Sequence, residues 1–522
     1  MRVSDVLFFC LAATFTYALK ERQLSWTVGQ TVQTSSGPVN GHPAGTAKQV
    51  SEYLGIPYAL PPVGNLRWEP PQKYNGSSTI NGTNFGYSCP AVVSPPPNAT
   101  AVAKANVTAA GLEILDLVDE VGTTFGEDCL TLNVWTKPQT GDAKKAVLVW
   151  IYGGGFVYGN TDNPGYNGQY IADQEDVVLV SMNYRLNIFG FPGNPAGTNN
   201  LGLLDQRLAI EWVRDNIENF GGDTSRITIF GQSAGGASVD YFTFAWTSDP
   251  IVSGLISESG TVFGIKPNSN ATNTASWFNV SSTLGCGDAT SDSTSVLECM
   301  RTKPYTSIIS AIPSSNSVTG LGGFGPAVDG VVVFDDYLSR AESGNFIKAP
   351  LLVGNADYEA GLFQTIAALK GVVYSGDYWA AFDLIGFTCP AGIRANLSLA
   401  NNIPTWRYRW FGAFPNTELT TVPSSGAWHA SELALLFGNF PFGPGVPDST
   451  TAEVAIGNYT RGAWAAFAKD PVNGLNTYGG GWPLNNDWEF DGKWDWHCDV
   501  KWKSGWKPDI ASYGTSVEGK CG

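Results

Sequence analysis

The sequence predicts an α/β fold, in which helices flank a central, mostly parallel and twisted sheet and long excursions leave this scaffold. Short apolar, β-branched runs alternate along the chain with stretches of helical periodicity. The 522 residues, of which 43% are hydrophobic and 15% are charged, are enough to bury a large core. No internal repeat or low-complexity block points to a different architecture.

Four of these runs are predicted as strands, because near-continuous apolar sequence is typical of parallel strands buried on both faces. The runs are AVLVWIY (146–152), DVVLVSMNY (176–184), RITIF (226–230) and PLLVG (350–354). Apolar residues from Ile210 to Phe220 recur at helical spacing and predict a helix over one face of the sheet. Strand signals resume after the Pro- and Ser-rich stretches 94–100 and 313–318, so these are expected as excursions and residues 19–522 as a single domain.

The charge balance argues against a nucleic-acid partner. Lys and Arg number 30 against 46 Asp and Glu, a formal net charge of −16, whereas phosphate backbones are bound chiefly by Lys and Arg. Only 3 histidines are present, and no Cys-x-x-Cys or His-Glu-x-x-His spacing provides for zinc. We therefore predict neither a metal nor another cofactor.

The N-terminus has the pattern of a secretory signal peptide over residues 1–18. Arg2 precedes an apolar run from Val6 to Tyr17, and the small residue Ala18 follows it. That run is too short to span a bilayer, and no later segment is long and apolar enough to do so. The expected product is a secreted, extracellular protein without a transmembrane anchor, and its oligomeric state is not predicted.

Glycosylation motifs agree with a secretory route. Asn-x-Ser/Thr acceptor sites occur at Asn75, Asn81, Asn98, Asn106, Asn270, Asn279, Asn396 and Asn458. Outside the signal, the cysteines are Cys89, Cys129, Cys286, Cys299, Cys389, Cys498 and Cys521, an odd number that allows three disulfides and one thiol. The residues alone leave the pairing open.

The motif FGQSAGG is the sharpest chemical signal in the chain. Its residues Gly231 to Gly235 satisfy Gly-x-Ser-x-Gly with Ser233 at the centre. The predicted strand RITIF runs directly into it, and small residues that can begin a helix follow. This strand–turn–helix context predicts a nucleophile elbow, in which glycines leave room for a serine on a tight turn.

A second glycine cluster would serve such a nucleophile. Gly153, Gly154 and Gly155 directly follow the strand AVLVWIY, so their backbone N–H groups can face a substrate without intervening Cβ atoms. The alternative of a phosphate-binding loop fails, because neither Gly-x-Gly-x-x-Gly nor a Gly-Lys-Ser/Thr ending is present. We therefore expect an oxyanion hole at this position.

With these motifs the chain resembles the type-B carboxylesterase/lipase family of cholinesterase-like α/β-hydrolases, in particular its secreted fungal members. The matching stretches are EYLGIPYALPPVGNLRW (52–68), GEDCLTLNVW (126–135), YGGGF (152–156), NYRLNIFGF (183–191), GLLDQRLAIEWVRDNIENFGGDTSRITIFGQSAGG (202–236) and FGPAVDG (324–330). The resemblance implies the α/β-hydrolase fold and hydrolysis of carboxylic esters through a Ser–acid–His triad in that order.

By resemblance, the acid follows the strand PLLVG and the histidine lies nearer the C-terminus. Glu359 in NADYEAGLF is the acid we favour. Asp357 is its competitor, because the stretch is one residue longer than the family's usual motif. His429 in GAWHASELALLFG stands at the family's base position, while His42 and His497 lie outside the expected segment.

The resemblance also assigns supporting groups. The amides of Gly154, Gly155 and Ala234 would bind the oxyanion, and Ser259 would support Glu359, although an ordinary polar residue is nearly as good a reading of Ser259. The family suggests the pairs Cys89–Cys129 and Cys286–Cys299. For the C-terminal region we suggest Cys498–Cys521.

The expected substrate is a small-molecule or lipid-like ester, and the sequence defines it less closely than it defines the reaction. Residues 89–129 contain no Trp, which disfavours choline esters. In the same loop, Glu113, Asp116 and Asp119 would form one helical face and Leu112, Leu115 and Val118 another. A helix over 112–121 with these faces suits a lid of a lipase or sterol esterase, or a fixed helix packed on the body.

Six tryptophans close to the C-terminus could stack on sugars or lie at a lipid surface, although packing is the commoner role. They are Trp482, Trp488, Trp494, Trp496, Trp502 and Trp506. Two other classes stay open beside the ester hydrolase: a non-catalytic adhesion or binding glycoprotein of the same fold, which the intact triad disfavours, and a serine peptidase.

Overall fold

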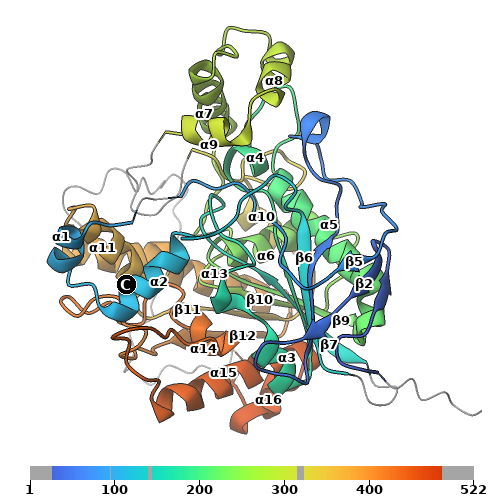
Figure 1. The fold of residues 1–522 in the computed structure, drawn as a ribbon. Coiled ribbons are helices and arrows are strands. Elements are labelled where there is room, and N and C mark those ends of the chain that lie inside the picture. The colour runs from blue at the N-terminus through green and yellow to red at the C-terminus, as the bar shows by residue number, and fades with distance from the viewer. Residues whose placement is uncertain (1–25, 94–95, 139–143, 314–322, 485–522) are drawn as a thin grey trace, which may run out of the picture.

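The computed structural model describes residues 26–93, 96–138, 144–313 and 323–484 (Figure 1). The predicted signal peptide lies outside the described residues, and so do five of the six tryptophans near the C-terminus. Trp482, the sixth, packs against Tyr459 and Trp464, and its indole N–H donates to the Tyr459 hydroxyl at 2.7 Å. Trp482 is therefore a packing residue.

The described residues form a nine-stranded sheet in the order β12-β11-β10-β9-β7-β8-β6-β4-β3. The strands from β12 to β8 run parallel, whereas β6, β4 and β3 each pair antiparallel with their neighbour. The strands are β3 (His42–Pro43), β4 (Ser51–Pro57), β6 (Thr131–Thr136), β7 (Lys145–Ile151), β8 (Val178–Met182), β9 (Gly222–Gln232), β10 (Gly254–Glu258), β11 (Leu351–Ala356) and β12 (Thr405–Trp410). A smaller sheet joins β1 (Val32–Thr34), β2 (Gly37–Asn40) and β5 (Ile80–Asn81).

The sheet confirms the predicted α/β class. The four predicted strands are β7, β8, β9 and β11, and all of them lie in the parallel part. Every residue of β7, β8 and β11 is buried, which explains why their sequences show no polar alternation. The main difference is β9, which begins four residues before the predicted Arg226.

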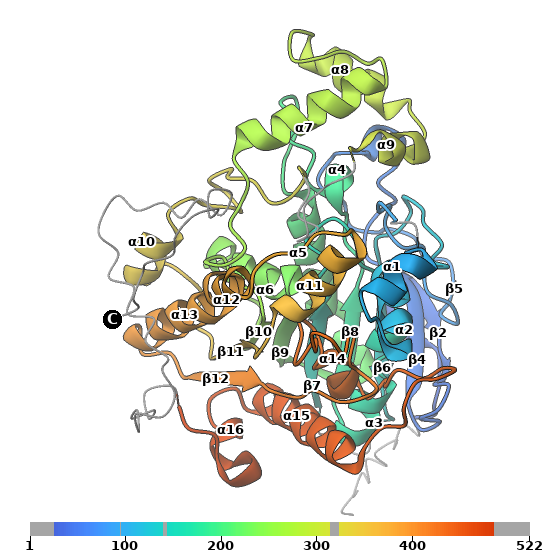
Figure 2. The same cartoon turned by 90° about the vertical axis from the view of Figure 1, so that its left-hand side faces the viewer.

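Helices cover both faces of this sheet (Figure 2). One face carries α3 (Gln169–Glu175) and α15 (Thr451–Lys469), and the other carries α5 (Leu201–Asn216), α6 (Ala234–Ala245) and α13 (Cys389–Ala400). The predicted helix over 210–220 is the second half of α5 with a 3₁₀ turn, η3 (Ile217–Phe220), which Gly221 ends at φ 84°. That left-handed conformation suits glycine.

The excursions carry most of the remaining helices. A disulfide between Cys89 and Cys129 closes a loop that holds α1 (Ala99–Lys104) and α2 (Ala109–Val118). The segment with α7 (Asn270–Thr283), α8 (Ser293–Arg301) and α9 (Tyr305–Ala311) projects from the body, and the Cys286–Cys299 disulfide ties α8 to the end of α7 (Figure 1). Cys389 is also disulfide-bonded, whereas the suggested Cys498–Cys521 pair lies outside the described residues.

The other short elements connect these parts. The α-helices are α4 (Asn187–Gly190), α10 (Tyr337–Glu342), α11 (Ala360–Leu369), α12 (Gly376–Asp383), α14 (Leu433–Phe437) and α16 (Gly474–Thr477). The turns are η1 (Gly64–Leu66), η2 (Pro164–Tyr166), the π-helical η4 (Leu384–Thr388) and η5 (Tyr478–Gly480). No helix within the described ranges is both long enough and apolar enough to cross a membrane.

Candidate active site

Ser233 lies on the turn between β9 and α6, where the sequence motif places it. Its backbone has φ 59° and ψ −122°, a conformation that costs a non-glycine residue energy and that the turn imposes. Gly235 permits the turn, because a Cβ there would lie 2.0 Å from the carbonyl oxygen of Ile151 on β7. The strained turn holds the serine side chain away from the sheet and toward a cavity.

The glycine cluster lies beside this serine. A Cβ on Gly153 would stand 2.9 Å from the Cβ of Ser233, so the loop after β7 approaches the elbow closely. Gly154 and Gly155 have φ values of 100° and 61°. Ala234 is the first residue of α6, where the positive end of the helix dipole also lies. The structure therefore brings together the backbone segments that the sequence predicted for an oxyanion hole.

Glu359 reaches the same place from the end of β11. Its Oε1 accepts hydrogen bonds from the Ser259 hydroxyl at 2.6 Å and from the Ala356 N–H at 2.7 Å, and its Oε2 contacts Nδ1 of His429. The side chain is fully buried. Asp357, the competing acid, is 39% exposed and pairs with Arg409 at 2.6 Å. The structure thus joins Glu359 and Ser259, and not Asp357, to His429.

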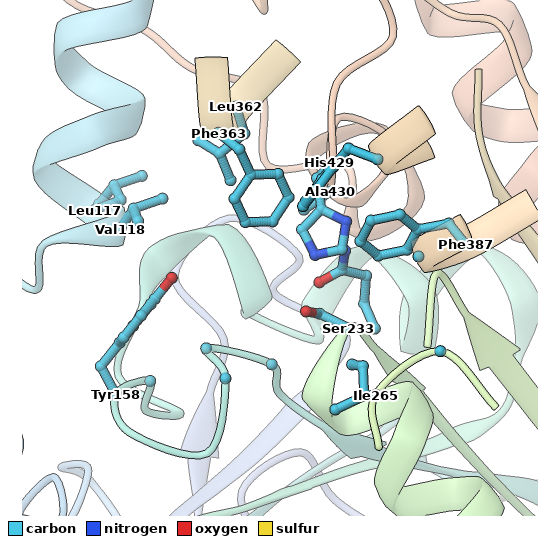
Figure 3. Close-up of a pocket in the computed structure, with 18 of the residues that line it drawn as sticks. Leu117, Val118, Tyr158, Ser233, Ile265, Leu362, Phe363, Phe387, His429 and Ala430 are labelled. Atoms are coloured by element: carbon cyan, nitrogen blue, oxygen red, sulfur yellow. The ribbon is translucent and has the colours of Figure 1, made fainter. Parts of the chain in front are cut away.

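Two phenylalanines hold the His429 ring. Its centroid is 5.1 Å from that of Phe363 on α11 and 4.9 Å from that of Phe387 on η4. The ring lies over the Ser233 hydroxyl (Figure 3), and its Nε2 is buried with no hydrogen-bond partner among the described residues. Because Nδ1 contacts Glu359, Nε2 is the ring nitrogen that can accept a proton on the side of Ser233.

Three further acids, which no sequence motif marks, lie in this region: Glu258 and Glu432 are buried and Asp383 is half-buried. Burial raises the pKa of Glu258 to about 8, although Trp464 donates to its carboxyl at 2.5 Å. Burial and the neighbouring carboxyls raise the pKa of Glu432 well above its ordinary value. Burial also raises the pKa of Asp383 to about 7. Because such groups stay largely protonated in mildly acidic solution, they add little negative charge beside Glu359.

The cavity above Ser233 has a volume of about 290 Å³ and extends to both sides of the serine (Figure 3). One side is apolar and includes Ile265 and Phe387, with Phe382 and Ile385 nearby. Leu117 and Val118 of α2, together with Tyr158, form the opposite side. The η4 residues come from a region without a recognisable motif, so only the folded chain shows that they line the site.

The segment that contains α2 is fastened to the body. Thr108 donates its N–H to the backbone oxygen of Leu419 at 2.9 Å and its hydroxyl to the backbone oxygen of Glu418 at 2.5 Å. Ile114 and Leu115 pack with a buried cluster around Trp428. The predicted apolar face is partly wrong. Leu112 is 36% exposed, whereas Ile114 is buried, because the helix turns its Ile114–Leu115 edge toward α11. In this structure α2 is therefore packed against the body beside the cavity.

The remaining histidines lie elsewhere. His42 is on β3, where its Nδ1 stands 3.8 Å from Glu52, and His497 lies outside the described residues. In the part of the chain that the structure describes, no group of three or more His, Cys, Asp or Glu side chains is arranged to hold a metal ion.

The parallel sheet with a serine on the β9–α6 elbow defines an α/β-hydrolase. Comparisons with known proteins lead to the same class. A model of the Carboxylesterase family matches residues 28–374. The chain therefore belongs to the carboxylesterase family, and it is a carboxylic ester hydrolase.

Individual relatives are similar over most of their length. The chain is 34% identical to a chlorogenic acid esterase of Aspergillus niger, over 85% of this chain and 84% of that protein. It is 31% identical to secreted lipase 5 of Gibberella zeae, over 88% of each. Among solved structures, a PNB esterase superimposes with a TM-score of 0.71 at 27% identity, over 88% of this chain and 93% of that one.

Proposed function

We propose that the chain is a secreted serine esterase in which Ser233, His429 and Glu359 form the catalytic triad. The observation that carries the proposal is the chain of contacts from Ser259 through Glu359 to the His429 ring, which lies over Ser233. Each side chain has the chemistry that its place requires: a hydroxyl nucleophile, an imidazole base and a buried carboxylate.

The reaction proceeds in two halves. In the first, the Ser233 hydroxyl attacks the ester carbonyl while Nε2 of His429 takes its proton. The N–H groups of Gly154, Gly155 and Ala234 stabilise the oxyanion, and Glu359 stabilises the imidazolium that forms. The alcohol leaves with the proton from Nε2. In the second half, water attacks the acyl-serine by the same route and releases the acid.

The cavity favours a small or medium-sized ester over a bulky lipid. Its volume of about 290 Å³, beside the packed α2 segment, matches an ester of that size. An esterase is therefore our choice over the lipase with a lid in residues 89–129, although relatives of both names exist. A binding glycoprotein without catalysis is disfavoured by the complete triad, and amide hydrolysis by the family.

Secretion is also part of the proposal. All eight asparagines of the glycosylation motifs occupy exposed positions, where an oligosaccharide could be attached without disturbing the core. Two relatives are named as secreted lipases. Treatment of the product from the culture medium with an N-glycosidase should increase its mobility on a gel, and its N-terminus should lie after residue 18.

Hydrolysis of p-nitrophenyl esters of graded chain length tests the mechanism. Ser233→Ala should reduce kcat by at least about 10³-fold, because the nucleophile is lost while binding is kept. Ser225→Ala, which removes an exposed hydroxyl at the start of β9, is the matched control and should leave kcat unchanged. Equal rates for Ser233→Ala and the wild type would disprove the proposed nucleophile.

A further inference from the structure

One side of the cavity carries polar groups that the triad does not use. Glu120, Asn160 and Asn163 line it together with the rings of Tyr158 and Tyr166. We call these five residues the polar lobe. Glu120 follows the end of α2 and Tyr158 lies on the α2 side of Ser233, whereas Phe387 of η4 lies across the serine (Figure 3). The cavity therefore presents two chemically different surfaces to the two sides of a bound ester.

Glu120 occupies a backbone position that ordinarily belongs to glycine. It follows the end of α2 with φ 56°, the Glu120 N–H donates to Leu117, and the Val121 N–H donates to Asp116 at 3.0 Å. This pair of hydrogen bonds is a Schellman motif, whose left-handed residue is usually Gly and sometimes Asn. A glutamate here strains the backbone without any benefit to the helix.

The same side chain is also expensive to bury. Glu120 is only 5% exposed, and burial raises its pKa to about 7 despite hydrogen bonds from Asn160 and from the Gly159 N–H. The Asn160 amide donates to the Glu120 carboxyl at 2.6 Å, while the Asn160 Oδ1 is buried without a partner among the described residues. Both the left-handed backbone of Glu120 and the burial of its carboxyl cost stability. A carboxyl that is kept at the cavity wall despite these two costs is typical of a functional group.

We propose that Glu120 determines substrate specificity by hydrogen bonding to a hydroxyl group of the ester, with Asn160 as the residue that positions its carboxyl. This inference rests on the proposed hydrolysis at Ser233 and names the class of substrate: a small ester with a hydroxyl-bearing half and an apolar half. The hydroxyl-bearing half occupies the polar lobe. The apolar half lies against Ile265 and the η4 residues.

A hydroxyl suits this lobe better than a cation. At neutral pH part of the Glu120 population is protonated, so the carboxyl can both donate and accept, as a hydroxyl does, whereas an ammonium group only donates. The desolvation cost of a hydroxyl is also far smaller than that of an ammonium in a largely apolar cavity. The five lining residues include two tyrosine rings, which can cover the carbon skeleton of the same group.

Matched pairs of esters test the assignment through kcat/KM. The pairs are glycerol monobutyrate with propyl butyrate, and ethyl caffeate with ethyl cinnamate. The wild type should prefer the hydroxylated member of at least one pair. Glu120→Gly, which supplies the residue that the backbone favours, should lower kcat/KM for that member by about 10- to 100-fold and change the plain member by less than about threefold. Glu120→Gln keeps hydrogen-bonding atoms and should retain part of the preference.

Glu113→Gln is the matched control, because Glu113 is an exposed acid on α2, the helix that Glu120 follows, and does not line the cavity. If Glu120→Gly lowers kcat/KM equally for both members of a pair, the proposal is overturned. It is also overturned if Glu120 affects only the preference for butyrylcholine over the uncharged analogue in which a tert-butyl group replaces the trimethylammonium group. The plain esters report on the proposed function separately: if Ser233→Ala still hydrolyses them at the wild-type rate, the triad itself is wrong, whatever Glu120 does.

Discussion

Replacement of Glu359 by Gln should stop catalysis by fixing the wrong tautomer of His429. Both donors from the protein, Ser259 and the Ala356 N–H, bind Oε1, so the amide oxygen of a glutamine must take that place. The amide NH₂ then faces Nδ1 of His429, where Oε2 now lies. Since NH₂ can only donate, Nδ1 must accept, and the ring proton moves to Nε2. A base that already carries its proton cannot take one from Ser233.

The expected loss in kcat is about 10⁴-fold, which corresponds to about 5 kcal/mol in the activation barrier. The assay is steady-state hydrolysis of p-nitrophenyl butyrate, with circular dichroism to verify folding. Asp357→Asn is the control: it breaks a partly exposed ion pair with Arg409 and should cost less than about fivefold in kcat. A larger loss in Asp357→Asn than in Glu359→Gln would refute the assignment of the acid and the tautomer argument with it.

Two other variants test separate parts of the site. Gly154→Ala should lower kcat by about 10²- to 10³-fold, because φ is 100° and a Cβ would lie 2.2 Å from the Tyr158 carbonyl oxygen, so that the added methyl group displaces an oxyanion donor. Gly45→Ala is the control and should leave kcat unchanged, because a Cβ there meets nothing within 4 Å. A similar loss of kcat in both variants would point to a general effect on folding. Glu120→Gln should make the stability of the protein less sensitive to a rise in pH from 5 to 8. Burial raises the pKa of Glu120 from 4.5 to about 7, so the folded wild type binds more protons than the unfolded chain, and its stability falls by about 3 kcal/mol as the pH rises through this window. Urea unfolding at pH 5 and pH 8 measures the difference, and an equal decrease in wild type and variant would show that Glu120 does not cause it.

Much of the fold could be predicted because the information is local. The runs that became β7, β8, β9 and β11 are apolar throughout, and the structure buries them in the parallel part of the sheet. The elbow around Ser233 was readable for the same reason, since its glycines are required by backbone sterics within one turn. The apolar face of α2 was misjudged at Leu112, because helical periodicity does not say toward which neighbour a helix turns.

The α/β class, the position of Ser233 on its elbow and the glycines of the neighbouring loop could thus be predicted, since these depend on residues adjacent along the chain. The surroundings of these residues come from long-range packing. Glu359 is preferred to Asp357 because it reaches His429, 70 residues further along the chain. Phe387 and Glu120 reach the cavity from η4 and from the end of α2. Such contacts join segments far apart in sequence, and the packing of the whole chain fixes them.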